Sequence, residues 1–157
     1  MENLKYTFDQ VNEWIRTADQ KAMILGSFNI AGFIYQLVNI DKITCAGTYT
    51  VVIFIISVTA TLGALFLWLL ILYPRLNNDL KISKIYFCHI ANAYEKNKHT
   101  GVEDLLKITN DEYEKDLASQ ILENSFIAKK KYGYIQKFIW AFGVQLITLL
   151  LLLVSLM

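Results

Sequence analysis

The sequence contains little of what catalytic sites are usually built from. Its 157 residues include only two histidines, His89 and His99, and neither has a cysteine or carboxylate arranged around it as a catalytic triad requires. We interpret His89 as a helix-surface or interhelical residue and His99 as a solvated turn residue. No glycine-rich loop of the GxxxxGK[ST] or GxGxxG type is present to cradle a phosphate. We therefore expect that the protein is not an enzyme.

Cysteine, net charge and targeting signals are equally sparse. Cys45 and Cys88 form no C-x-x-C motif and no Cys/His cluster, so we expect no metal site. The formal net charge is +1, so no broad basic field favours a nucleic-acid partner. The first twenty residues include four acidic side chains, which is the wrong character for a cleavable signal peptide.

What the sequence does have is a long uncharged run. Residues 51–73 read VVIFIISVTATLGALFLWLLILY, and Pro74-Arg75 closes them. At 1.5 Å per residue the run is roughly 30 Å long, which matches the hydrocarbon core of a bilayer. It has no polar face, unlike a helix in a soluble core. The whole chain is 55% hydrophobic. We conclude that the chain lives in a membrane.

Two further apolar stretches predict an all-α membrane protein of about three transmembrane helices. The section between the second and third spans is expected to be a cytoplasmic helical hairpin, with one helix over 78–96 and a second that begins near Val102 or Asp111. The continuous part of this second helix is expected from about Asn110. This last helix has no strong break before the third span and is expected to continue to the C-terminus. The whole chain, 1–157, is taken as one domain. Its expected segments are an amphipathic N-terminal helix (1–21), span 1 (22–40), a polar hairpin loop (41–50), span 2 (51–73), the cytoplasmic helical section (75–137) and span 3 (138–156).

The distribution of lysine and arginine predicts the orientation. The 41–50 loop has a single basic residue, Lys42, whereas the 75–137 section has eleven and the N-terminal segment has three. Basic loops stay in the cytoplasm, so we expect the N-terminus and the helical section inside and the short loop and C-terminus outside. Cys45 and Cys88 then lie on opposite sides of the membrane and cannot pair.

The segment WIRTADQKA, residues 14–22, lies where the first helix enters the membrane. Trp14 suits the interface, and Lys21 can extend its ammonium back to the headgroups. Asp19 fits less well, because a carboxylate at a membrane boundary is costly to desolvate unless it is paired. Three interpretations stay open: an interhelical salt bridge, for which Lys129–Lys131 lie at a similar expected depth, a ligand-sensing role, or plain solvation.

Lys129, Lys130, Lys131 and Lys137 form a basic cluster next to the third span. One interpretation is that the cluster fixes topology and attracts anionic lipid, at roughly 1 kcal/mol per residue near the surface. The other is a phosphate site on the cytoplasmic face. The residues alone favour the first.

Taken in order along nearly the whole chain, several short motifs resemble the transmembrane effector family of Pycsar, the bacterial pyrimidine-cyclase antiphage defence system. The motifs that carry this resemblance are Trp14 with Ala18–Ala22, Tyr73-Pro74-Arg75, Tyr86-Phe87 with Ile90-Ala91, Asp116–Ala118 with Gln120-Ile121, and Ser125, Ile127-Ala128 and Lys131-Tyr132.

The resemblance implies an effector of the bacterial inner membrane that senses a cyclic nucleotide, oligomerises and impairs the membrane, leading to abortive infection. It implies a nucleotide cyclase that supplies the signal, with cyclic UMP or cyclic CMP favoured. The chain has no separate β-roll domain for cyclic nucleotides, so its own helices would have to bind the ligand. The candidate residues for ligand binding or signal coupling are Trp14, Asp19, Lys21, Arg75, Tyr86, Gln120, Lys131 and Tyr132.

Three spans are too few to enclose a pore, so a conducting structure requires several copies, in contact with membrane lipid. An alternative function is a non-enzymatic scaffold that holds a partner at the membrane through its cytoplasmic helices. The small or polar positions suited to line or seal an assembly are Gly26, Ser27, Asn29, Gly32, Gln36, Ser57, Thr59, Thr61 and Gly63.

Overall fold

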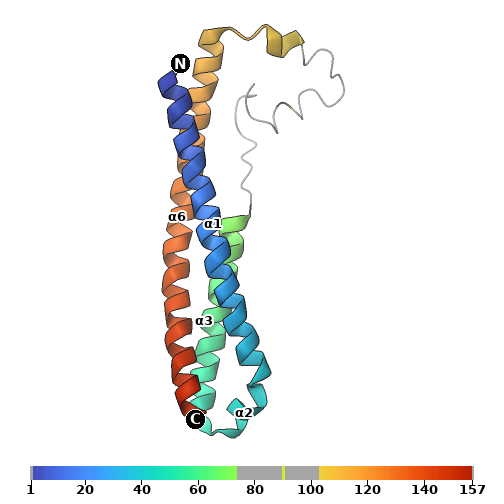
Figure 1. The fold of residues 1–157 in the computed structure, drawn as a ribbon, viewed down its shortest axis with the longest axis vertical. Coiled ribbons are helices and arrows are strands. Elements are labelled where there is room, and N and C mark those ends of the chain that lie inside the picture. The colour runs from blue at the N-terminus through green and yellow to red at the C-terminus, as the bar shows by residue number, and fades with distance from the viewer. Residues whose placement is uncertain (1, 74–89, 91–102, 157) are drawn as a thin grey trace. The chain divides into compact units, whose positions relative to one another are not determined.

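The computed structural model describes residues 2–73, 90 and 103–156, and in these ranges the only regular secondary structure is helical (Figure 1). Three helices are long and apolar enough to cross a membrane, which confirms the predicted all-α class and the count of three spans. The helix expected over 78–96 lies outside the described residues. Four helices have described bounds: α1 (Glu2–Val38), α2 (Ile40–Cys45), α3 (Thr48–Leu72) and α6 (Asn110–Ser155).

The start of α6 follows directly from its sequence. The backbone N–H of Glu112 donates to Thr109 Oγ1 at 3.4 Å, and the backbone N–H of Thr109 donates to Glu112 Oε2 at 3.3 Å. This reciprocal pair is a capping box, which satisfies two backbone donors that the first turn leaves without partners. Asp111 and Glu112 also place negative charge at the positive end of the helix dipole. The predicted long helix from about Asn110 is thereby confirmed.

The other ends are set by proline and glycine. α3 ends at Leu72, and Tyr73 is extended with φ −65° and ψ 120°, as expected for a residue that precedes a proline. The loop expected over 41–50 contains the short helix α2, whose Ile43 is fully buried. Gly47 then turns the chain into α3 with φ +108°, a conformation that other residues rarely adopt.

The chain divides into two compact units. We call residues 1–15 and 74–129 the charged unit, and residues 16–73 and 130–157 the apolar unit. The single domain expected over 1–157 stays a prediction. In the charged unit, Val11 of α1 and Leu117 and Ala128 of α6 are buried, and Asn124 Nδ2 donates to Asn12 Oδ1 at 2.9 Å. The charged unit therefore buries three apolar side chains and has one polar pair between α1 and α6.

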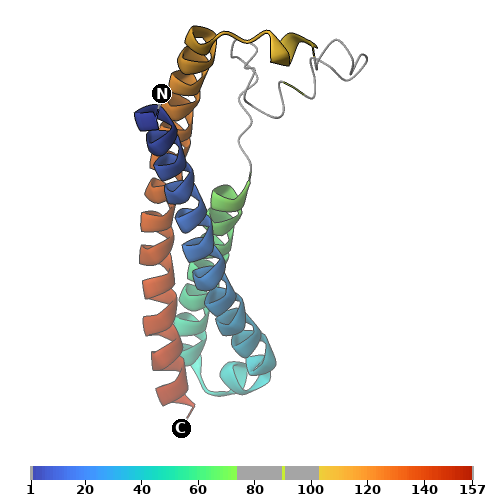
Figure 2. The same cartoon turned by 45° about the horizontal axis from the view of Figure 1, so that its top comes forward.

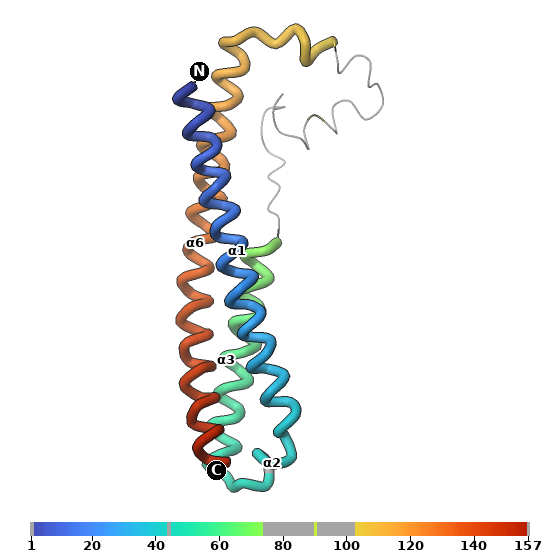
Figure 3. The backbone as a smooth tube through the Cα atoms, in the orientation of Figure 1, coloured from blue at the N-terminus to red at the C-terminus, as the bar shows by residue number. Residues whose placement is uncertain are grey.

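In the apolar unit, α1, α3 and α6 lie side by side (Figures 2 and 3). Asp19 contacts Lys131 and Asn29 contacts Gln145, so residue numbers rise together and α1 runs parallel to α6. Gln36 meets Ser57, whereas an added Cβ on Gly26 would meet the Trp68 ring, so α3 runs antiparallel to α1.

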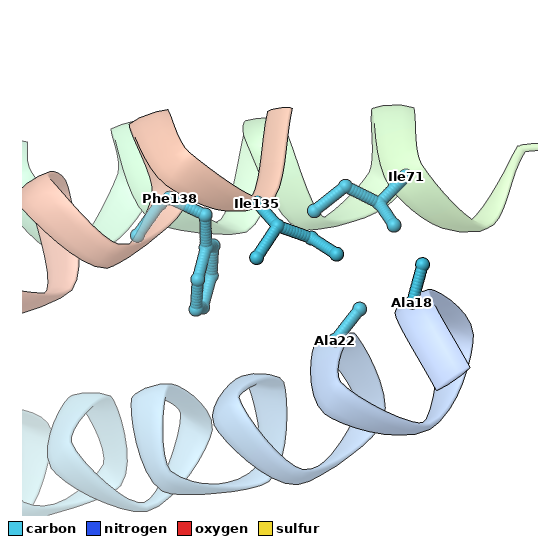
Figure 4. Packing of buried hydrophobic residues seen from close by; sticks show 6 residues of the cluster. Ala18, Ala22, Ile71, Ile135 and Phe138 are labelled. Carbon is cyan, nitrogen blue, oxygen red and sulfur yellow. The ribbon is translucent and has the colours of Figure 1, made fainter. Parts of the chain in front are cut away.

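One end of the apolar unit has an apolar core. We call this core the first apolar cluster, and Figure 4 shows its α1 alanines facing isoleucine and phenylalanine side chains of α3 and α6. Gly26 extends this packing, because a Cβ there would lie 2.3 Å from Trp68 Nε1. The small residues of α1 therefore let the bulky side chains of its neighbours approach closely. The cluster consists of Ala18, Ala22, Ala64, Ile71, Ile135 and Phe138.

Candidate functional site

Two of the predicted site residues form an interhelical ion pair. Lys131 Nζ on α6 donates to Asp19 Oδ1 on α1. The side chains are 15% and 34% exposed respectively, so both charges are partly withdrawn from water. Each charge removes the penalty that the other would suffer if it were buried alone. Of the three interpretations left open for Asp19, the structure shows the salt bridge.

Two further candidates lie on the same pair of helices. The Lys21 ammonium stands over the Tyr132 ring, 5.9 Å from its centroid. Both residues are exposed, and they neighbour Asp19 and Lys131 in the sequence. We call Asp19, Lys21, Lys131 and Tyr132 the α1/α6 quartet. It combines two cations, one carboxylate and one aromatic face on two parallel helices.

These four groups match the chemistry of a small nucleotide. Ammonium groups such as those of Lys21 and Lys131 attract a phosphate, and an aromatic face such as that of Tyr132 stacks on a base. The Asp19 carboxylate accepts hydrogen bonds from a ribose hydroxyl or a base N–H, but it repels a phosphate. A ligand at this position would therefore compete with Asp19 for Lys131.

The other four predicted site residues lie outside the α1/α6 quartet. Trp14 belongs to the charged unit and is half exposed, whereas Gln120 of the same unit is buried. Arg75 and Tyr86 lie outside the described residues. The structure thus joins four of the eight candidates in two contacts between α1 and α6, Asp19 with Lys131 and Lys21 with Tyr132, and the ligand-binding role of all eight stays a prediction.

The end of the apolar unit that holds the α1/α6 quartet is strongly basic. It has five basic side chains and a single acidic one, Asp19, which gives a net charge of +4. At the opposite end of the unit, in α2, the charges of Asp41 and Lys42 cancel. Such an asymmetry across an apolar unit follows the positive-inside pattern. The five basic residues are Arg16, Lys21, Lys130, Lys131 and Lys137.

The middle of the apolar unit contains a set of buried polar side chains, which we call the polar layer. Asn29 Nδ2 donates to Gln145 Oε1 at 2.8 Å, and Gln145 Nε2 donates back to the Asn29 carbonyl oxygen at 3.2 Å. Gln36 Nε2 donates to Ser57 Oγ at 2.6 Å. The polar layer consists of Asn29, Gln36, Ser57, Thr61, Gln145 and Thr148, each at most 8% exposed.

The sequence analysis did not separate these residues from their exposed neighbours. It grouped nine small or polar positions as assembly surfaces, but Asn29, Gln36, Ser57 and Thr61 are buried inside a single chain. Ser27, Thr59 and Gly63 are exposed. The signal that separates them is spacing, because positions 29 and 36 repeat with the heptad period of a packed helix face.

Among the described residues, no three His, Cys, Asp or Glu side chains are grouped to hold a metal ion. The fold and these contacts define a small α-helical protein with three helices suited to cross a membrane. Along the apolar unit, the polar layer lies between two apolar clusters, and one end of the unit is basic.

A comparison with family models identifies this class more closely. A family model described as the Pycsar effector protein domain matches residues 3–157, nearly the whole chain. The chain therefore belongs to the Pycsar effector family, as its motifs predicted. Membership supports an antiphage effector role, and the family is one of membrane effectors and not a known enzyme family. No curated protein and no solved structure matched the chain.

Proposed function

We propose that this protein senses a cyclic nucleotide, oligomerises in the bacterial inner membrane and impairs its integrity, so that an infected cell stops growing or dies. The observation that carries the proposal is the family match over residues 3–157. The three helices that are long and apolar enough to cross a bilayer support it, because an effector that impairs a membrane must be inserted in it.

The charge distribution supports a cytoplasmic N-terminus. The end of the apolar unit that follows Arg16 has a net charge of +4, and the end near Asp41 has none. Cys45, which is exposed at the end of α2, would then face the periplasm. A membrane-impermeant maleimide applied to intact cells should label Cys45 in a Cys88→Ser chain. If Cys45 is labelled only after the inner membrane is broken, the N-terminus lies in the periplasm and the proposed orientation is wrong.

The α1/α6 quartet is the part of the described chain best suited to receive the signal. A pyrimidine cyclic nucleotide would place its phosphate near Lys21 and Lys131 and its base near Tyr132. Displacement of the Asp19 contact would then alter how α1 meets α6. For the signal to drive assembly, the nucleotide must bind the assembled state more tightly than the resting state.

The primary test is membrane potential in bacteria that express the chain, read with a voltage-sensitive dye. A cyclase is induced to supply cyclic UMP, cyclic CMP or a purine cyclic nucleotide. Depolarisation with a pyrimidine signal and not with the purine supports the proposal. Absence of depolarisation with every signal, although the protein is in the membrane, would contradict it and favour a membrane scaffold instead.

Variants then test the site. Asp19→Asn and Lys131→Ala should each abolish signal-dependent depolarisation while the protein still inserts. Lys130→Ala is the matched control, because it removes the same charge one residue away from an exposed position. If both quartet variants respond like the parent chain, the quartet is not the signal site, although the effector function would stand.

A further inference from the structure

The hydrogen bonding of the polar layer is incomplete. Asn29 and Gln36 are both 0% exposed, yet Asn29 Oδ1 and Gln36 Oε1 have no hydrogen-bond partner. Exchanging the nitrogen and oxygen of an amide group does not remove the problem, because the other atom would then lack a partner. Buried polar atoms in proteins are nearly always satisfied by protein or water. No side chain or backbone group of the described residues therefore satisfies these two amide oxygens.

The position of the layer is also distinctive. On α3, Ser57 and Thr61 lie between Ile53 and Ala64, which belong to different apolar clusters. On α6, Gln145 and Thr148 likewise lie between Phe138 and Leu152. The second cluster is built from Ile43, Ile53 and Leu152, packed with Phe54 and Leu156.

The apolar unit therefore has the order apolar, polar, apolar along its interior. From Asn29 to Gln36 the polar section of α1 rises by about 10 Å, in the middle of the segment suited to cross the bilayer. Hydrophobic constrictions close channels by excluding water, and polar side chains inside a membrane mark the routes of ions. The two apolar clusters occupy the places where such constrictions would lie.

A purely adhesive role explains the layer less well. Hydrogen bonds between membrane helices contribute on average only about 0.6 kcal/mol each. A buried amide oxygen without a partner opposes this with a penalty of about 1–3 kcal/mol. Apolar side chains of similar size at positions 29 and 36 would hold the three helices together without that penalty. The presence of both amides at buried positions therefore favours a second state in which they meet water.

We propose that the polar layer is the closed central section of the ion path, an inference that rests on the function proposed above. In the resting chain the two apolar clusters seal it at both ends. On activation the helices separate at the first apolar cluster, and Gln36, Ser57 and Gln145 face a water-filled lumen completed by further copies of the chain. The lining is neutral amide and hydroxyl oxygen, which suits hydrated monovalent ions.

Single cysteines test this assignment. In a chain with Cys45→Ser and Cys88→Ser, Ser57→Cys places a thiol in the polar layer at little change in volume. Thr59→Cys is the matched control, two residues away on the exposed side of α3, where Thr59 Oγ1 donates only to the Ile55 carbonyl oxygen. Thr61→Cys is a second layer position. Cells are exposed to a charged, water-soluble methanethiosulfonate reagent before and after cyclic UMP or cyclic CMP is supplied.

We expect the thiol at position 57 or 61 to be protected before the signal and modified after it, with loss of further depolarisation as the charged adduct obstructs the path. The thiol at position 59 should stay protected throughout. Depolarisation without modification at 57 and 61, or with modification at 59 instead, would overturn the inference and leave the proposed function standing. If neither the cysteine-free chain nor the native chain depolarises the membrane after the signal, the proposed function itself would be rejected.

Discussion

The charged unit and the apolar unit use the same two helices for opposite environments. Within each unit α1 and α6 are parallel. Each unit also has a polar contact between these helices, and the two contacts have the same separation in sequence: Asn12–Asn124 in the charged unit and Asp19–Lys131 in the apolar unit. In the charged unit Val11, Leu117 and Ala128 are also buried. The helix pairing is therefore similar while its surroundings change.

The surfaces of the two units differ most. The described residues of the charged unit include ten acidic and four basic side chains, a net charge of −6. The apolar unit exposes large hydrophobic residues such as Phe66 and Trp140 and buries Asn29, Gln36 and Gln145. Polar groups go outward where water is the solvent and inward where lipid is. The comparison indicates that one unit is adapted to water and the other to a bilayer.

The largest effect is expected from matched glycine substitutions in the apolar unit. Gly26→Ala would place a Cβ 2.3 Å from Trp68 Nε1, and we expect it to destabilise the unit by about 1–3 kcal/mol. Gly63→Ala has nothing within 4 Å and should stabilise α3 by about 1 kcal/mol through helix propensity. Unfolding of the purified protein in detergent, titrated with SDS, measures both. Equal effects of the two changes would contradict this packing.

The ion pair should give the next largest effect. Asp19→Asn leaves the Lys131 ammonium unpaired at 15% exposure, and we expect a loss of about 1–2 kcal/mol, between the values for exposed and buried pairs. The exchange Asp19→Lys with Lys131→Asp should recover most of that stability. It should not recover the nucleotide response, because the charges are reversed. Recovery of both would show that the pair is only structural.

A smaller and local effect is expected in the charged unit. Thr109→Ala removes the capping hydroxyl of α6 and should cost about 1 kcal/mol. The loss should appear as faster hydrogen exchange in the first turns after Asn110, with little change in the apolar unit. Thr7→Ala is the control, because Thr7 Oγ1 only bonds the Asn3 carbonyl oxygen within an exposed part of α1. Faster exchange throughout α3 would mean that the units unfold together.

The sequence was sufficient for the parts of the fold that depend on local chemistry. The uncharged run 51–73 predicted α3, and the T-x-x-E pattern at Thr109–Glu112 accounts for a helix that begins at Asn110. The helix α2 was not predicted, because its formation depends on the burial of Ile43 against residues far along the chain. Local patterns do not report such contacts.

The candidate site was only partly predictable for the same reason. The unfavourable position of Asp19 at a membrane boundary suggested a partner, and the structure places Lys131 there. The heptad spacing of Asn29 and Gln36 separates them from Ser27, which is exposed, but it does not tell whether their shared face packs inside its own chain. A polar side chain in a membrane helix can face either its own bundle or another copy, and the choice depends on how the helices pack.

The smallest expected effects compare one polar pair in each unit. Double-mutant cycles on Asn12–Asn124 and on Asn29–Gln145, with leucine at each position, should give similar coupling energies of about 0.5–1 kcal/mol. The single variants should differ, because Asn124→Leu leaves an amide that water can reach, whereas Gln145→Leu leaves the Asn29 amide buried in the apolar unit. Unfolding in detergent measures all of the variants. A single-variant loss at Gln145 no greater than that at Asn124 would indicate that water already reaches the polar layer in the resting protein, which would place the seal elsewhere than at the two apolar clusters.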